Sequence, residues 1–179
     1  MPASEPTVRA AAIQLIVQNE GRLSRPILEI GVGYGFYGQT LRGKFPNAEI
    51  YGVEVWPPYI TPEHLKWYTA VILANASRVD YALFQAKGVS LIIAADVIEH
   101  FEKREAVALM EKWKRVAPWI VATLPIKRYE QGAFEGNTHE AHLHHWTVAE
   151  IERDLGLSMV ADCGLCGLFQ FYRERGERA

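Results

Sequence analysis

The chain has 179 residues, of which 49% are hydrophobic, so it is long enough for one well-buried domain and too short for two of ordinary size. Its 19 Lys and Arg residues against 21 Asp and Glu residues give a net charge of −2, which leaves no overall field favouring nucleic acid or an anionic membrane surface. No run approaches the roughly 18 apolar residues of a membrane span, and residues 1–20 lack the pattern of a secretory signal. We therefore expect one cytoplasmic domain over residues 1–179.

Strand-like and helix-like segments alternate along the chain. Apolar runs typical of buried strands lie at residues 27–30, 49–55, 70–74, 89–95, 119–125, 158–162 and 168–173. Helical spacing or helix-capping residues lie at residues 7–19, 39–45, 61–68, 77–85, 102–117 and 147–156. The N-terminal helix, within residues 1–20, is expected to cover one edge of the sheet. This alternation predicts an α/β fold with a mostly parallel sheet, helices on both faces and an antiparallel final strand.

The two cysteines, Cys163 and Cys166, have the C-x-x-C spacing of some redox and zinc sites. They lie in a predicted strand-turn region near the C-terminus, not at the start of a helix after a first strand. This position favours a structural role over redox or zinc chemistry.

A glycine-rich turn directly follows the predicted strand at residues 27–30, and a short helix follows the turn. Glycine allows positive φ angles and lets a ligand's ribose or phosphate approach the backbone. The spacing of Gly33, Gly35 and Gly38 matches the G-x-G-x-x-G pattern of dinucleotide sites, which is a weak signal on its own. The turn therefore predicts a nucleotide-cofactor site at the N-terminus of the following helix.

A second pattern overlaps the first, because Glu29, Gly31, Gly33 and Gly35 form an acid-x-G-x-G-x-G sequence. In this respect the chain resembles the class I S-adenosylmethionine-dependent methyltransferases. A carboxylate inside a buried parallel strand is costly unless it meets a charged or hydrogen-bonding partner. The ammonium group of S-adenosylmethionine is such a partner for Glu29.

Other candidate cofactor residues lie at the carboxyl ends of the next predicted strands, where α/β sheets bind ligands. Glu54 lies 23 residues after Gly31, a position from which a carboxylate can accept both hydrogen bonds of a ribose diol. Val55 and Trp56 follow it and are candidates to pack on the adenine ring, although Trp56 fits a core position equally well. The resemblance further implies that Asn75 lies near the adenine amino group and that the backbone of Ala76 lies beside the ring. Asparagine there retains an acceptor oxygen without the charge of the more usual aspartate.

Asp96 to Phe101 form a second motif, Asp-Val-Ile-Glu-His-Phe, after the fourth predicted strand. It is similar to the segment found there in a methyltransferase group that includes the ubiquinone-biosynthesis O-methyltransferases, many small-molecule enzymes and the small-RNA 3′-end methyltransferases. The first motif, this one and residues 121–125 occur in the family's order. The resemblance implies a Rossmann-like, doubly wound, seven-stranded sheet of order 3-2-1-4-5-7-6, and it places Asp96 among the cofactor-binding residues.

His100 is a candidate general base because the unperturbed pKa of histidine lies near neutrality, although ordering of the loop explains it equally well. Four of the six histidines lie within residues 126–146, where the family commonly builds its acceptor pocket: His139, His142, His144 and His145. Among these, His142 is the second catalytic candidate. The small-RNA methyltransferases bind a divalent metal with a related motif, so the resemblance implies Asp96, Glu99, His100 and His142 as an alternative ligand set for Mg²⁺ or a transition ion. A solvated, histidine-rich loop is the commoner explanation.

These residues predict an enzyme that transfers a methyl group from S-adenosylmethionine to an oxygen or nitrogen atom of a small molecule. One alternative is a metal-assisted RNA 2′-O-methyltransferase, which the net charge of −2 disfavours. Another is a partner subunit that binds the cofactor without activity of its own. The oligomeric state is left open.

Overall fold

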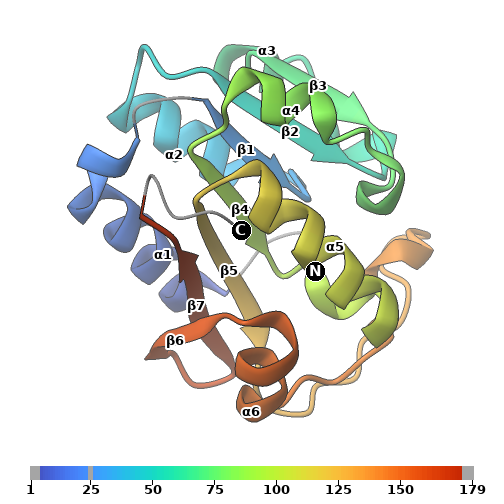
Figure 1. Ribbon diagram of the computed structural model, residues 1–179. Helices are drawn as coiled ribbons and strands as arrows, with labels where there is room; N and C mark the ends of the chain where they lie inside the picture. Colours follow the sequence, from blue (N-terminus) through green and yellow to red (C-terminus); the bar gives the residue numbers. More distant parts are fainter. Residues whose placement is uncertain (1–4, 24–25, 175–179) are drawn as a thin grey trace.

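The computed structural model describes residues 5–23 and 26–174 and contains a seven-stranded sheet with helices on both faces (Figure 1). The strand order is β3-β2-β1-β4-β5-β7-β6. Neighbours among the first five strands run parallel, whereas β7 runs antiparallel to both β5 and β6. The predicted strand order and the antiparallel last strand are confirmed.

The element bounds are close to the predicted ones. The strands are β1 (Ile27–Ile30), β2 (Ile50–Glu54), β3 (Ala70–Leu73), β4 (Leu91–Ala95), β5 (Trp119–Pro125), β6 (Ser158–Asp162) and β7 (Cys166–Tyr172). The α-helices are α1 (Pro6–Gln18), α2 (Phe36–Lys44), α3 (His64–Trp67), α4 (Ala82–Lys87), α5 (Lys103–Val116) and α6 (Val148–Glu150). A π-helical turn, Ile151–Leu155, continues α6, and 3₁₀ turns lie at Glu20–Arg22, Pro57–Tyr59, Ala76–Arg78, Ile98–His100 and Thr138–Glu140. Within the described residues, every helix is too short or too polar to cross a lipid bilayer.

The two faces of the sheet carry separate apolar cores. On one face, α1 and α2 pack against side chains that include Ile27, Ile50 and Trp119. On the other face, α4 and α5 cover the sheet, and Trp113 of α5 is fully buried. The apolar stripe of α1 packs on β5 and β7, so this helix covers a face of the sheet and not an edge as predicted.

The helix predicted at residues 77–85 is divided into a 3₁₀ turn and α4. Asn75 accepts a hydrogen bond from the N–H of Ser77 (2.9 Å), and Asp80 accepts one from the N–H of Ala82 (3.0 Å). Each contact starts its own helical turn, because short polar side chains compete for nearby backbone donors. Ser77, the first residue of the predicted helix, is therefore a donor to Asn75 and does not cap the helix itself.

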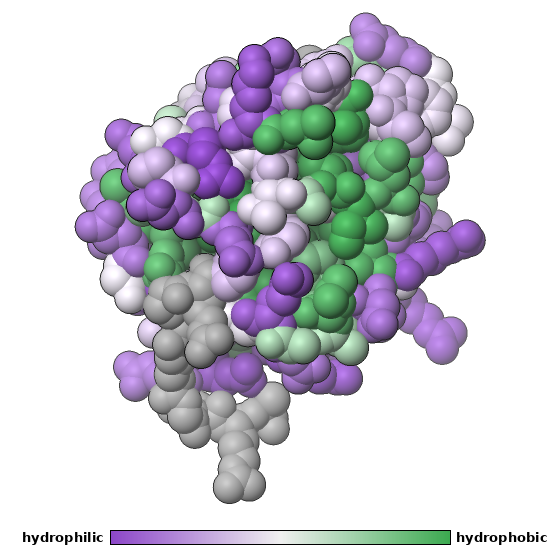
Figure 2. Space-filling model, turned by 90° about the horizontal axis from the view of Figure 1, so that it is seen from above, coloured by the Kyte–Doolittle hydropathy of each residue, from purple (hydrophilic) through white to green (hydrophobic). Residues whose placement is uncertain are grey.

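The sheet edge at β3 is apolar and partly exposed. Figure 2 looks onto the side of the molecule that carries α3 and β3, and it shows a band of hydrophobic residues bordered by hydrophilic ones. Leu65 of α3 and Leu73 of β3 are among the exposed apolar residues. Neither of them lines the cavity described below, which opens at the carboxyl ends of the strands.

Candidate active site

A cavity of about 900 Å³, with the solvent at its mouth included, lies beyond the carboxyl ends of β1, β2 and β4. The predicted residues that line it are Glu29, Gly31, Gly33, Glu54, Val55, Asn75, Ala76, Asp96 and His100. Gly35, Trp56 and His142 do not line it. Six further lining residues were not singled out individually from the sequence: Arg9, Phe36, Tyr37, Tyr59, Asn137 and Glu140. The lining combines apolar and aromatic side chains with a few polar groups, which is typical of a site for a small organic ligand.

The glycine turn has the left-handed backbone that its sequence predicts. The φ angles of Gly31, Gly33 and Gly35 are 74°, 52° and 78°. A Cβ at Gly31 would lie 2.5 Å from Cγ2 of Val97, so both backbone angle and space require glycine there. Gly35 is the N-cap of α2, and a Cβ there would meet the side chains of Trp67 and His64.

Glu54 is buried at the end of β2, and both of its carboxylate oxygens accept backbone hydrogen bonds. The N–H of Gly33 donates to Oε2 (2.8 Å), and the N–H of Trp56 donates to Oε1 (2.7 Å). Burial raises the pKa of Glu54, and these hydrogen bonds oppose the rise. The contacts link the turn after β1 to the end of β2 and leave each oxygen a second lone pair for a ligand.

Glu29 is 2% exposed and already has a hydrogen-bond partner within the protein. The hydroxyl of Tyr68 donates to its Oε2 (2.7 Å), and the N–H of Gly38 donates to that hydroxyl (3.2 Å). Burial raises the pKa of Glu29 to about 8. Sequence patterning did not indicate Tyr68, because nothing in the periodicity pairs residues this far apart.

Asn75 and Asp96 also make contacts that constrain their roles. The carboxamide oxygen of Asn75 accepts from both the N–H and the hydroxyl of Ser77 (2.9 Å each), so the acceptor expected near adenine is engaged in a turn. Asp96 has a φ of 52°, unusual for a residue other than glycine, and accepts a hydrogen bond from the Thr123 hydroxyl (2.9 Å). Such backbone strain is typical of functional sites.

Glu99, His100 and His142 come together beside the cavity. Each offers one ligand atom, and these atoms lie within 4.8 Å of one another. Asp96 is not part of this group, so the structure gathers three of the four residues of the alternative metal set. Sequence reasoning identified the group's members, and the described residues contain no other such cluster.

The surroundings of this group suit metal binding. Nδ1 of His100 lies 3.1 Å from the Ala141 carbonyl, and Nδ1 of His142 lies 2.8 Å from the Tyr129 carbonyl. Because a carbonyl only accepts, both Nδ1 atoms are donors, and burial lowers the pKa of both histidines and so favours the neutral imidazole, in which Nε2 keeps its lone pair. The carboxylate of Glu99 is 2% exposed and neither oxygen has a hydrogen-bond partner among the described residues, so burial raises its pKa well above the usual range. A cation would satisfy this orphaned carboxylate.

The segment that carries His142 is attached to the rest of the site at several points. The N–H of Leu143 donates to the carbonyl of Glu99 (2.9 Å). At the cavity, the Tyr59 hydroxyl donates to Oε1 of Glu140 (3.1 Å). The segment at residues 126–146 is therefore held beside Glu99 and contributes Asn137, His139 and Glu140 to the cavity lining, whereas its role as an acceptor-site loop stays a prediction.

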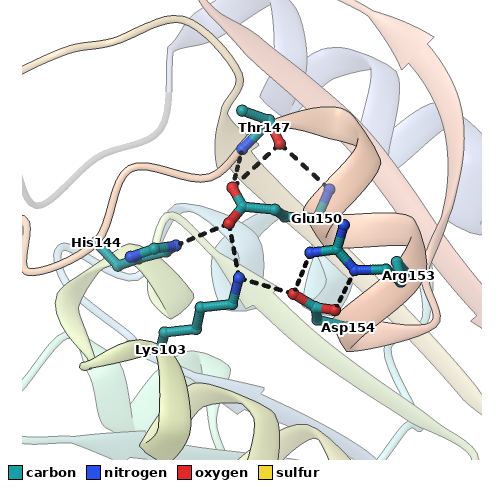
Figure 3. Close-up of polar contacts among 6 residues, drawn as sticks. All are labelled: Lys103, His144, Thr147, Glu150, Arg153 and Asp154. Atoms are coloured by element: carbon teal, nitrogen blue, oxygen red, sulfur yellow. Dashed lines mark hydrogen bonds and ion pairs between the residues drawn. The ribbon is translucent and has the colours of Figure 1, made fainter.

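A polar network next to this segment joins α5 to α6 (Figure 3). Lys103 forms ion pairs with Glu150 (2.6 Å) and Asp154 (2.8 Å), and Nε2 of His144 lies 3.7 Å from Glu150. Thr147 and Glu150 form the predicted capping box. Hydrogen bonds from Lys103 and Thr147 lower the pKa of Glu150 to about 2. The network anchors Thr147 and Glu150, which follow the histidine-rich segment and Trp146.

Comparison with protein-family models gives no match. A search of curated proteins likewise gives none. Solved structures do match. A candidate O-methyltransferase from Nostoc punctiforme is 19% identical with a TM-score of 0.65, and the match covers 94% of this chain and 57% of that one. The chain thus spans little more than half the length of the Nostoc protein.

Two further solved structures cover more of the compared proteins. The magnesium protoporphyrin IX methyltransferase of Synechocystis, with S-adenosylhomocysteine bound, is 14% identical with a TM-score of 0.64, over 92% of this chain and 80% of that one. The methyltransferase domain of a bacterial Hen1 is 14% identical with a TM-score of 0.62, over 93% of this chain and 98% of that one. Together with the strand order, these similarities establish that the chain has the Rossmann-like fold of these methyltransferases.

Proposed function

We propose that this chain is an S-adenosylmethionine-dependent methyltransferase. The observation that carries the proposal is the position of Glu54, which the N–H groups of Gly33 and Trp56 hold at the cavity beside the left-handed glycine turn. A carboxylate fixed in this way offers the two acceptors that a ribose diol needs. The fold shared with methyltransferases supports this cofactor over a dinucleotide.

The other cofactor contacts follow from the same cavity. Glu29 lies where a carboxylate can meet an ammonium group, and Val55 and Ala76 offer apolar surface to an adenine ring. When bound, the cofactor supplies an electrophilic methyl group on a sulfonium. The protein then has to hold an acceptor in line with that methyl group and, for a hydroxyl acceptor, remove its proton.

The proposed acceptor is an oxygen or nitrogen atom of a small molecule. Phe36 and Tyr59 offer aromatic surface in the cavity, and Asn137 and Glu140 offer polar groups. His100 lines the same cavity with Nε2 unprotonated, so it is placed to accept a proton. In this version of the mechanism His100 is the general base.

The cluster of Glu99, His100 and His142 supports a second candidate, metal-assisted methylation of a hydroxyl. Two imidazoles and one carboxylate suit a transition ion such as Zn²⁺ or Mn²⁺ better than Mg²⁺, which prefers oxygen ligands. A metal there would lower the pKa of a bound hydroxyl. The two versions exclude each other, because the lone pair on Nε2 of His100 either binds the metal or accepts the proton.

His142→Ala distinguishes the two versions, because His142 belongs to the metal cluster but does not line the cavity. If a metal assists, His142→Ala and treatment with a chelator both abolish methyl transfer, and adding Zn²⁺ or Mn²⁺ restores the chelated wild type. If His100 is the base, His100→Ala abolishes transfer, whereas His142→Ala and the chelator leave most of it.

The acceptor class is tested with S-adenosylmethionine labelled in its methyl group and added to a cell extract. The proposal expects label in the fraction that passes a small-pore filter. Label in nuclease-sensitive RNA would instead support the RNA methyltransferase. Binding of the cofactor with label in neither fraction would contradict the proposed activity and favour a non-catalytic partner subunit.

A further inference from the structure

Arg9 of α1 is a cation within a mostly acidic cavity. It is the only Arg or Lys among the described residues that line the cavity, alongside Glu29, Glu54, Asp96 and Glu140. Each of these four carboxylates accepts at least one hydrogen bond from the protein. Within residues 5–23 and 26–174, by contrast, no carboxylate forms an ion pair with Arg9. A half-buried guanidinium of this kind has donors to offer to an anionic ligand.

The guanidinium is held in place by an aromatic ring. Cζ of Arg9 lies 4.4 Å from the centre of the Phe36 ring, and Phe36 is the first residue of α2, directly after the glycine turn. This contact is a cation–π contact and occupies none of the five N–H donors of the guanidinium in a hydrogen bond to the ring, so they remain available to an anion. Arg9 therefore lies at the glycine-turn end of the cavity, against Phe36.

Glu29 lies on the same face of the sheet. Val8, which precedes Arg9, belongs to the apolar core that also contains Tyr37 and Tyr68, and Tyr68 is the hydrogen-bond partner of Glu29. The carboxylate of Glu29 and the guanidinium of Arg9, at the same end of the cavity, complement the ammonium and the carboxylate of an amino acid. The methyl donor carries such a group, with an ammonium and a carboxylate on one carbon.

We propose that Arg9 binds the α-carboxylate of S-adenosylmethionine, opposite the ammonium group that Glu29 receives. This inference rests on the proposed function. The adenosine end of the donor then lies toward Glu54 and Asn75, and the sulfonium lies between the two ends of the cavity. The same guanidinium chemistry would also suit an anionic acceptor, and the experiment separates these two sources of the anion.

The test measures binding by calorimetry with two probes, S-adenosylhomocysteine and its decarboxylated analogue, which lacks only the carboxylate. In the wild type, S-adenosylhomocysteine should bind more tightly than the analogue. Arg9→Gln should weaken the binding of S-adenosylhomocysteine by roughly 10- to 100-fold, as expected for a lost charge-assisted hydrogen bond. It should leave the affinity for the analogue almost unchanged. Arg9→Lys should recover part of the loss. Arg104→Gln, on the exposed side of α5, is the matched control and should change neither affinity.

The remaining outcomes are decisive. If Arg9→Gln keeps its preference for S-adenosylhomocysteine over the analogue, the proposal is overturned. Arg9 is then a residue that binds an anionic acceptor and not the cofactor. If Arg9→Gln weakens both probes equally while its melting temperature without ligand falls, the residue is structural and the proposal is also wrong. If the wild type binds the analogue as tightly as S-adenosylhomocysteine, cofactor binding stands and only the role of Arg9 fails. If the wild type binds neither probe, the proposed function itself fails.

Discussion

Replacing Glu29 by glutamine should stabilise the protein without ligand. The carboxylate lies inside β1 and is 2% exposed, and burial raises its pKa from 4.5 to about 8. Glutamine has nearly the same shape and can still accept the hydrogen bond from the Tyr68 hydroxyl (2.7 Å in the wild type). Glu29→Gln therefore removes an ionisable group that the folded state disfavours in its charged form.

The gain in free energy of unfolding depends on pH, and the raised pKa of Glu29 sets the direction of this dependence. Because the pKa of Glu29 is higher in the folded state, ionisation destabilises the fold progressively as pH rises from 4.5 toward 8. The linkage gives a penalty of about 1 kcal/mol at pH 5 and about 4 kcal/mol at pH 8. The free energy of unfolding of Glu29→Gln, relative to wild type, should thus be greater by about 3 kcal/mol at pH 8 than at pH 5.

Urea unfolding of both proteins at the two pH values measures this difference, with Glu152→Gln, an exposed acid, as the control. We expect the control to show no such pH dependence. A Glu29→Gln variant that is no more stable than wild type at pH 8 would show that the buried charge of Glu29 does not destabilise the fold. The same variant should bind S-adenosylhomocysteine less tightly, because an amide replaces the carboxylate proposed to meet the ammonium. Stability and ligand affinity should therefore change in opposite directions.

Three other predictions concern the framework of the site. In α2, Gly38→Ala should lower the free energy of unfolding by about 1–3 kcal/mol, because its Cβ would lie 2.1 Å from Cζ of Tyr68. In the same helix, the Cβ of Gly43→Ala would meet nothing within 4 Å, and this variant should raise the free energy of unfolding by up to about 1 kcal/mol. Urea unfolding measures both variants, and equal effects would contradict a clash at Gly38. His142→Ala should weaken Zn²⁺ binding, followed by calorimetry, by roughly 10-fold or more, and an unchanged affinity would exclude the cluster as the metal site. Lys103→Met should lower the melting temperature at pH 7, and this loss should shrink as pH falls from 5 toward 2, because its partner carboxylates, whose pKa values the ion pairs lower, begin to be protonated; a loss independent of pH would argue against the ion pairs.

The sequence predicted the sheet and the location of the site because both depend on local patterns. Apolar runs and capping residues mark each strand and helix, and a carboxylate at the end of a parallel strand has to lie at the ligand-binding edge. Glu54 and Asp96 accordingly line the same cavity, although they lie 42 residues apart in the chain. The order of the strands came from the resemblance to methyltransferases and not from periodicity.

The partners of these residues could not be predicted in the same way. Periodicity reports which face of an element is buried and carries no information about which distant side chain lies opposite. The pairing of Glu29 with Tyr68 and the position of Arg9 over Phe36 were therefore not accessible from the sequence. The division of the helix at residues 77–85 was missed because two polar residues compete to start it.

Calorimetric titration of S-adenosylhomocysteine into wild type and Glu54→Gln tests whether Glu54 organises a site for S-adenosylmethionine. The amide keeps the size of the side chain but removes one of the acceptors that bind the diol and the N–H groups of Gly33 and Trp56. We predict micromolar binding to the wild type and a loss of roughly 10-fold or more in the variant. Absence of binding heat with the wild type at high micromolar concentration, or equal affinity in the two proteins, would contradict the account.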